Sequence, residues 1–460
     1  MRLLYRRCAG LDIHKDSISV CIRTRVSGKA EAEVLEERFA TFTQELERLA
    51  AWLKEHKVRQ VAMESTGVYW IPVWNILERR SFGFQLMLVN PATVRALQGC
   101  KTDRIDARRI AEFLQYGLLR GSFIPPKPVR QMRELTRMRV HVQQDRNRTI
   151  NRIGRLLETA NIKLGSVASN IVGKSGRAIL DMLAAGSTDA ERMADKALGQ
   201  LRAKMPALIL ALDGRTDAHF RWMLSRQLRK LDGLDAELAA LDQKTEADME
   251  SHRDLVERLC TIPGIDKTTA RTLISELGTD MSQFPDAAHA ASWAGLCPGN
   301  SESAGKRFSG KTRKGDRYLR RILVQSAWAA ARTRDCFFAA LFHRIAQRRG
   351  MKKAAVAVAH RLLTIVYTLI RDGGVYHERG GDYFDRRNPA RTAKKLTARL
   401  QKIGFEVVLK RTPLTPVAPS NVVAAEICSK CHRWRLSQCI HDQPRPKRTN
   451  KRRNPTGSVT

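Results

Sequence analysis

A proline cluster at residues 124–128 divides the chain into two parts with different periodicity. The run Ile124-Pro125-Pro126-Lys127-Pro128 is typical of a linker. Before it, residues 1–120 alternate between short apolar runs with strand spacing and segments with helical spacing. After it, long helical patterns dominate. The sequence therefore predicts an α/β domain followed by mostly helical units.

The α/β part begins with a strong strand pattern. Leu11, Ile13, Ile18, Val20 and Ile22 are mostly two positions apart, which indicates a half-buried strand with a bend at residues 14–16. Further strands are expected at 34–39, 58–63 and 84–89, and helices at 42–57, 68–80 and 105–119. This order favours a mixed sheet covered by helices.

Two long helical segments follow the linker. One has Leu135, Val142, Thr149 and Leu156 at intervals of seven, and the other has leucines at threes and fours over residues 224–241. This spacing predicts a coiled coil or helical hairpin, and the more specific hypothesis is a coiled coil through which the chain dimerises. The alternative is an ordinary amphipathic bundle.

The charge of the chain limits its partners. It has 82 Lys and Arg against 46 Asp and Glu, a net charge of +36, which favours a polyanionic partner. No apolar segment follows Arg2, Arg6 and Arg7, so no signal peptide is expected. His360 and Arg361 interrupt the longest apolar stretch, and six of the nine cysteines are scattered singly. We expect a soluble, cytoplasmic, nucleoid-associated protein that binds nucleic acid.

Four acidic residues stand out by their placement. Asp12 lies in an apolar strand, Glu64 ends the strand of Val61, Ala62 and Met63, and Asp103 and Asp106 are three apart at a helix start. A cluster of carboxylates becomes favourable around a divalent cation. Each residue also has a simpler reading: Asp12 in a turn, Glu64 at a solvated strand end, Asp103 as a helix N-cap and Asp106 as a first-turn acid.

A glycine turn near residue 264 resembles a helix-hairpin-helix. The segment Leu259-Cys260-Thr261-Ile262-Pro263-Gly264-Ile265 precedes a helical pattern. In such motifs, backbone N–H groups near the glycine bind a DNA phosphate, so Gly264 is a candidate contact. A plain helix–turn–helix connection is the alternative.

A serine-rich and strongly basic segment covers residues 295–321. Small residues let a backbone approach a phosphate, and a serine among cations is a candidate nucleophile. The alternative is a solvated loop whose serines form turns. The candidate nucleic-acid contacts here are Lys306, Arg307, Lys311, Arg313, Lys314, Arg317 and Arg320, with Arg321 beside them.

Taken together, these motifs resemble the DEDD transposases of bacterial insertion sequences, described as bridge-RNA-guided recombinases and as relatives of the Piv-type DNA invertase. The resemblance covers about residues 8–375 and includes the segment 295–315. Its N-terminal motifs are Gly10-Leu11-Asp12-Ile13-His14-Lys15, Met63-Glu64-Ser65-Thr66-Gly67-Val68-Tyr69, Val89-Asn90-Pro91 and Lys101-Thr102-Asp103-Arg104-Ile105-Asp106-Ala107.

The resemblance implies a RuvC-like, RNase H-type catalytic domain at 1–128 and a C-terminal transposase domain at 251–375, on either side of the helical or coiled-coil region at 129–250. The excess of Lys and Arg over residues 376–460 separately predicts a basic, largely disordered tail. It implies that Asp12, Glu64, Asp103 and Asp106 bind Mg²⁺, as one or two ions with Mn²⁺ as a substitute. It also implies that Ser303 attacks DNA, with Ser301 and Ser309 as fallbacks.

The implied partners are donor and target DNA, a structured guide RNA and further copies of the chain in a dimer or tetramer, with no membrane. An active site shared between subunits is expected. The tail lies outside the resemblance. Its Cys428, Cys431, Cys439 and His441 have the ligand count of a zinc site, and three free thiols are the alternative.

Two other functions use the same residues differently. A structure-selective endonuclease of the Holliday-junction type would use water as nucleophile, leaving Ser303 structural. A non-catalytic basic nucleic-acid-binding protein would need none of the four carboxylates.

Overall fold

The computed structural model describes residues 3–25, 31–64, 67–91, 103–299, 301–303, 306–312, 314–410, 426–427 and 434–435. At residues 103–105, 301–303, 306–309, 426–427 and 434–435 it describes the backbone. The described chain forms two compact units, Met1–Arg387 and Asn388–Thr460.

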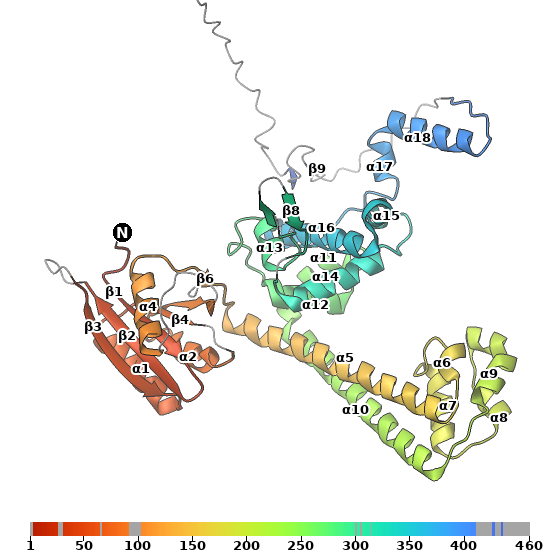
Figure 1. Cartoon of the computed structure of the whole chain (residues 1–460), viewed down its shortest axis with the longest axis horizontal. Coiled ribbons are helices and arrows are strands. Elements are labelled where there is room, and N and C mark those ends of the chain that lie inside the picture. Colours follow the sequence, from red (N-terminus) through yellow and green to blue (C-terminus); the bar gives the residue numbers. More distant parts are fainter. Residues whose placement is uncertain are drawn as a thin grey trace, which may run out of the picture. The chain divides into compact units, whose positions relative to one another are not determined.

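A six-stranded mixed sheet lies near the N-terminus (Figure 1). Its strand order is β3-β2-β1-β4-β5-β6. The strands β1, β2 and β3 are antiparallel, β1, β4 and β5 are parallel, and β6 is antiparallel to β5. This agrees with the predicted mixed sheet. The strands are β1 (Arg7–Ile13), β2 (Ser17–Thr24), β3 (Glu33–Ala40), β4 (Gln60–Glu64), β5 (Gln85–Val89) and β6 (Gly121–Ser122).

The first predicted strand is in fact two strands. β1 and β2 pair along their whole length, and a short turn closed by the hydrogen bond from the His14 amide to the Ser17 carbonyl (2.9 Å) joins them. Apolar residues two positions apart occur in both strands, which is why the sequence pattern predicts one bent strand.

Helices cover both faces of the sheet. Ala9, Leu11 and Ile13 of β1 point into a core with residues of α1 (Thr43–Glu55) and α2 (Trp70–Leu77). Cys8 points to the other face, where it clusters with Ile110 of α4 (Asp103–Gln115). Successive strand residues thus alternate between the two helical layers.

Two long helices, α5 (Lys127–Thr159) and α10 (Ala218–Asp248), pack against each other (Figure 1). Arg139 pairs with Asp242 (2.5 Å) and Arg146 with Asp235, so the helices are antiparallel. Within this chain the two helices form the predicted helical hairpin, and the dimerising coiled coil stays a prediction. The helices between them, gathered at one end of the pair, are α6 (Leu164–Val167), α7 (Lys174–Ala184), α8 (Ala190–Ala194), η1 (Gly199–Lys204) and α9 (Met205–Leu212).

The segment after the short helix η2 (Glu250–His252) is a helical unit that contains one strand hairpin. Its central helix, α16 (Met351–Asp372), is long and apolar enough to cross a membrane by length and composition. Eleven of its residues are buried, Tyr367 among them, as in the core helix of a globular domain. Its elements are α11 (Arg253–Cys260), α12 (Lys267–Leu277), α13 (Ala287–Trp293), β7 (Ser301–Ser303), β8 (Lys306–Ser309), α14 (Arg317–Ala330), α15 (Phe337–Arg349) and α16 (Met351–Asp372).

The tail contains some regular structure. The helices α17 (Tyr383–Arg386) and α18 (Pro389–Lys402) lie in the segment that was expected to be largely disordered, and β9 (Glu426–Ile427) pairs with β10 (Trp434–Arg435). The predicted zinc ligands Cys428, Cys431, Cys439 and His441 lie outside the described residues.

Candidate active site

Asp12 and Glu64 lie at the carboxyl ends of neighbouring parallel strands. The last register pair of β1 and β4 is Leu11 with Met63, so Asp12 and Glu64 each follow it by one residue. Asp12 is inside β1, opposite Ser19 of β2, so it is not a turn residue. Its side chain is buried, with 5% of the residue exposed, whereas Glu64 is half-buried.

Both carboxylates belong to the sheet face that α4 covers. Ala62, two residues before Glu64, clusters with Ile110 of α4 on this face. Cys8, four residues before Asp12, also lies there, and its thiol donates a hydrogen bond to the Ala111 carbonyl at 3.2 Å. Because side chains alternate along a strand, Asp12 and Glu64 share this face with them.

The packing of α4 on β1 directs Asp12 toward the start of the helix. A Cβ atom on Gly10 would come within 3.0 Å of the backbone of Ala107 and Ala111, so only glycine fits there. Cys8 contacts Ala111, whereas Gly10, two residues later in β1, also approaches Ala107, which lies one turn earlier in α4. The next residue on this face, Asp12, therefore lies toward the first turn of α4, which contains Asp103 and Asp106.

The described side chains show only part of the predicted carboxylate set. His14 Nε2 lies 3.1 Å from Asp12 Oδ2. Among the residues with described side chains, no three His, Cys, Asp or Glu lie close enough to hold one metal ion. The side chain of Asp103 is outside that set, and Asp106 is half-buried. The donors at this face are carboxylate oxygens, which fit a hard divalent cation.

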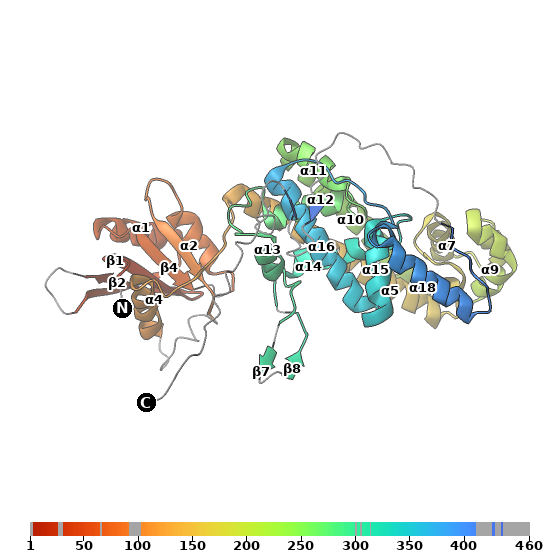
Figure 2. The same cartoon turned by 90° about the horizontal axis from the view of Figure 1, so that it is seen from above.

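The serine-rich segment forms a β-hairpin. β7 and β8 are antiparallel, with Ser303 opposite Lys306, Glu302 opposite Arg307 and Ser301 opposite Ser309. The ladder continues to an isolated bridge between Pro298 and Thr312. Figure 2 shows the hairpin extending away from α13 and α14. Ser303 is therefore in the last pair before the tip, and the side chains of the hairpin strands lie outside the described part.

The base of the hairpin, Gly315 and Asp316, is fixed to α13. A Cβ atom on Gly315 would collide with the backbone of Trp293 and Gly295, and the Asp316 amide donates to the Trp293 carbonyl at 3.1 Å. Asp316 also caps α14, since its Oδ1 accepts hydrogen bonds from the Leu319 amide (2.8 Å) and the amide before it. The base of the hairpin is thus held by contacts to α13 and α14.

A buried ionic network holds this base against α5. Glu276 of α12 is fully buried, and Arg137 donates to both of its carboxylate oxygens at 2.8 Å. The same guanidinium donates to Asp316 Oδ2 at 3.0 Å, and Arg133 Nε lies 3.1 Å from Glu276. Burial raises the pKa of Glu276, and the hydrogen bonds from Arg137 oppose that shift.

Sequence reasoning missed this network, although an acid in the apolar run around Leu273 was a usable signal.

Tyr318 extends the network. Its hydroxyl lies 2.9 Å from His141 Nε2 and accepts a hydrogen bond from Arg317 at 2.7 Å. The guanidiniums of Arg137 and Arg317 lie over its ring at 4.6 and 4.8 Å.

The predicted phosphate contacts differ in their surroundings. Gly264 has φ +85°, and a Cβ atom there would lie 2.5 Å from the Ser326 carbonyl oxygen, so packing against α14 already requires a glycine. Lys311, Lys314 and Arg317 are exposed, and Arg320 is half-buried. Lys306 and Arg307 are in β8, and Arg313 lies outside the described residues.

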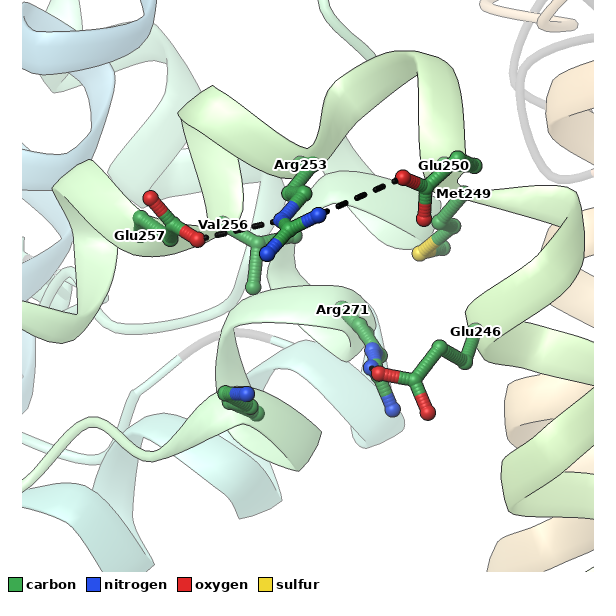
Figure 3. A pocket seen from close by; sticks show the side chains of 8 residues that line it. Glu246, Met249, Glu250, Arg253, Val256, Glu257 and Arg271 are labelled. Atoms are coloured by element: carbon green, nitrogen blue, oxygen red, sulfur yellow. Dashed lines mark hydrogen bonds and ion pairs between the residues drawn. The ribbon is translucent and has the colours of Figure 1, made fainter.

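A pocket of about 200 Å³ lies beside the glycine turn, between α10, α11 and α12. Figure 3 shows Arg253 between Glu250 and Glu257, at 3.6 and 3.2 Å. Arg271 pairs with Glu246 at 2.6 Å. The lining of the pocket carries three acids and three cations, the third cation being Lys267, so it offers a phosphate no net positive charge. It contains none of the predicted site residues.

Two family models match the chain. A model of IS110-type DEDD transposases, described as "Transposase", matches residues 9–162. A second, described as "Transposase IS116/IS110/IS902 family", matches residues 256–341. The first region includes Asp12, Glu64 and nearly all of the sheet, and the second includes the serine hairpin and α12 to α14.

Individual relatives agree with the models. The transposase for insertion sequence element IS1111A of Coxiella burnetii is 24% identical over 327 residues, which are 68% of this chain and 78% of that protein. The transposase for IS1328 of Yersinia enterocolitica is 25% identical over 304 residues, 64% of this chain and 79% of its own. The pilin gene-inverting protein of Moraxella bovis is 35% identical over 124 residues, 26% of this chain and 38% of its own.

Among solved structures, Thermus thermophilus RuvC matches 25% of this chain and 99% of its own chain, at 16% identity. The TM-score is 0.20, which is too low to support a conclusion about the fold. The family models and the relatives bear on identity directly. Together they establish that this chain belongs to the IS110/IS116/IS902 family of DEDD transposases of bacterial insertion sequences.

Proposed function

We propose that this chain cuts and rejoins DNA through a carboxylate-bound metal site and a serine nucleophile, guided by a structured RNA. The observation that supports this most is the position of Asp12 and Glu64, which follow the last register pair of β1 and β4 on the face covered by α4. The start of α4 supplies Asp103 and Asp106 to the same region. Membership of a transposase family makes DNA the substrate.

The N-terminal domain is RuvC-like, with an RNase H-type fold. The strand order supports this assignment: three antiparallel strands, β3-β2-β1, are followed by the parallel strands β4 and β5. In this arrangement Asp12 is on the central strand and Glu64 on its parallel neighbour. Catalytic groups at the carboxyl ends of parallel strands are typical of α/β sheets.

Asp12, Glu64, Asp103 and Asp106 hold one or two Mg²⁺ ions, for which Mn²⁺ substitutes. When bound, such ions activate the attacking oxygen at a phosphate and stabilise the leaving oxygen. The hydroxyl of Ser303 attacks phosphorus and the DNA strand leaves with a free hydroxyl end, so the protein becomes linked through phosphoserine. Attack by the hydroxyl of another strand end reverses the link and rejoins the DNA.

Ser303 is supported as the nucleophile by its place in the last pair before the hairpin tip, opposite Lys306. A cation there offsets charge that develops at phosphorus. Lys306, Arg307, Lys311, Arg313, Lys314, Arg317 and Arg320 form the DNA-phosphate contacts, with the Gly264 turn as a further one. Donor and target DNA and a guide RNA bind a dimer or tetramer whose active sites are shared between subunits, in the cytoplasm at the nucleoid.

The test is metal-dependent cutting of a plasmid that contains the insertion sequence encoding this chain. Wild type should cut in Mg²⁺ and stop when a chelator is added. Asp12→Asn and Glu64→Gln should still bind DNA but lose cutting by at least about 100-fold, the usual scale for losing transition-state charge stabilisation. Glu36→Gln, an exposed acid of the same domain, is the matched control and should cut normally. Normal cutting by Asp12→Asn would leave the non-catalytic binder as the better account.

A further inference from the structure

The outer face of α10 presents an aromatic ring followed by cations. Trp222, Arg226, Arg229 and Lys230 are all exposed, and 56% of Trp222 is accessible. Their spacing of four, seven and eight residues places them on one side of the helix. The opposite side, with Leu224, Leu228 and Leu231 among its residues, is buried in the core of the hairpin.

The cations of this face lack ion pairs within the part of the chain that the structure describes. Residues 218–231 contain no Asp or Glu. Arg226, Arg229 and Lys230 have no ion pair with any residue that the structure describes, and Arg226 instead lies over the Trp222 ring at 5.4 Å. Further along the same helix, Lys244 pairs with Asp248 at 2.6 Å. The unpaired charge is therefore local to the first half of α10.

An exposed indole beside unpaired guanidiniums is the chemistry that binds unpaired nucleotides. The ring offers a stacking surface to a base, and the arginines offer charge to phosphates. Arg229 lies seven residues after Trp222, about 10 Å along the helix, so both features face one strand. A lipid surface is a poor match, because Trp222 is the one large apolar side chain of this stripe.

We propose that this face of α10 binds an unpaired loop of RNA, with a base stacked on Trp222 and phosphates held by Arg226 and Arg229. Duplex DNA keeps its bases stacked inside the helix, whereas folded RNA displays unpaired bases in loops that stack on aromatic and arginine planes. The inference rests on the proposed function in one respect, namely that RNA is a ligand. It adds a surface on the helical hairpin that lies outside residues 306–321 and the tail.

The test measures affinity of the full chain for a labelled RNA hairpin with an unpaired loop, for its fully paired counterpart and for a DNA hairpin of the same sequence. Trp222→Ala should weaken binding of the looped RNA by about 5- to 150-fold, and Trp222→Phe by much less. Arg229→Gln should lower the slope of log affinity against log salt by about 0.7. The paired RNA should respond little to Trp222→Ala.

Lys244→Gln removes one cation from the same helix at a position that is already paired, so it is the matched control. If Trp222→Ala and Arg229→Gln bind the looped RNA as Lys244→Gln does, the surface is not used and the inference is wrong. It is also wrong if only the DNA hairpin responds. If wild type binds no RNA at all, both RNA guidance and this inference are wrong. If wild type binds the looped RNA and the two variants bind it equally well, only this inference is wrong.

Discussion

Gly10 fixes where the carboxylates of the candidate active site can lie. Its missing side chain allows the backbone of α4 to rest directly on β1. Asp12 follows two residues later on the same face, and the first turn of α4 contains Asp103 and Asp106. One glycine therefore couples the position of the helix acids to that of the strand acid.

Gly10→Ala should separate α4 from β1. Overpacking of this kind costs about 1–3 kcal/mol of unfolding free energy, and DNA cutting should fall because Asp103 and Asp106 move with the helix. Gly233→Ala is the control, because nothing lies within 4 Å of a Cβ atom there. It should be neutral or stabilising by up to about 1 kcal/mol. Urea denaturation of both variants measures the difference, and equal stabilities would contradict the packing described for α4.

Metal binding should be visible without any reaction. A ligand that binds only the folded state raises stability by mass action, by about 2.7 kcal/mol at 100 times its Kd. Mg²⁺ should therefore raise the melting temperature of wild type but not of Asp12→Asn or Glu64→Gln. In the absence of Mg²⁺, these variants should be at least as stable as wild type, because one of several repelling carboxylates is removed. An equal rise of the melting temperature with Mg²⁺ in Asp12→Asn would mean that Asp12 does not bind the metal.

At the scale of elements, the serine hairpin depends on its support. Asp316 links the hairpin base to α14, Arg137 links it to α5, and Glu276 provides the buried anion that holds Arg137. A hairpin that extends from helices needs such a base if its serine is to reach a phosphate in one geometry.

Glu276→Gln should be strongly destabilising. Breaking a buried ion pair leaves Arg133 and Arg137 with insufficient compensation and costs about 3–5 kcal/mol. Glu246→Gln removes an exposed acid that also pairs with an arginine, Arg271, and should cost at most about 1 kcal/mol. Urea denaturation compares the two. A cost for Glu276→Gln no larger than for Glu246→Gln would show that the network is dispensable.

The elements differ in how well the sequence predicts them. The mixed sheet and the long helices follow from apolar periodicity, because burial of one face dominates their stability. The sequence does not predict the β7–β8 hairpin, since strands of three and four residues rich in Ser, Lys and Arg show no apolar alternation. The bonds of Glu276 to Arg137 span 139 residues, and no local pattern reports such pairs.

The candidate site likewise has features that the sequence predicts and features that it does not. The positions of Asp12 and Glu64 at the ends of apolar strands could be predicted, because a carboxylate beside an apolar strand is costly unless it is used or paired. Their role in metal binding stays a prediction. Their common face depends on the register of β1 and β4 and on the approach of α4, which only the three-dimensional arrangement provides.

For the whole molecule, the net charge of +36 should make nucleic-acid binding steeply dependent on salt. On duplex DNA the slope of log affinity against log salt is about −0.9 per phosphate contacted. Deletion of residues 444–460, which include Arg445, Lys447 and Arg448, should make the slope less steep and weaken binding uniformly across DNA sequences. Insertion-site sequencing checks the second part. New insertion sites after the deletion would mean that the tail reads sequence.

A site shared between subunits predicts complementation. Ser303→Ala retains the carboxylates and Asp12→Ala retains the serine, so mixed oligomers can contain one complete site when the two halves come from different chains. Recombination by the mixture, with none from either variant alone, is the expected result. Inactivity of the mixture, under conditions in which wild type is active and mixed oligomers form, would place both halves in one chain.

The most direct measurement of the central claim is the covalent protein–DNA species itself. Wild type incubated with Mg²⁺ and the insertion-sequence plasmid should give a denaturant-resistant adduct whose tryptic peptide contains phosphoserine 303. Ser303→Ala should give none while still binding DNA and RNA. An adduct that persists in Ser303→Ala and disappears in Ser301→Ala or Ser309→Ala would move the nucleophile to that serine. Cut strands without an adduct in any variant would contradict the account, because water would then be the nucleophile and the chain a nuclease.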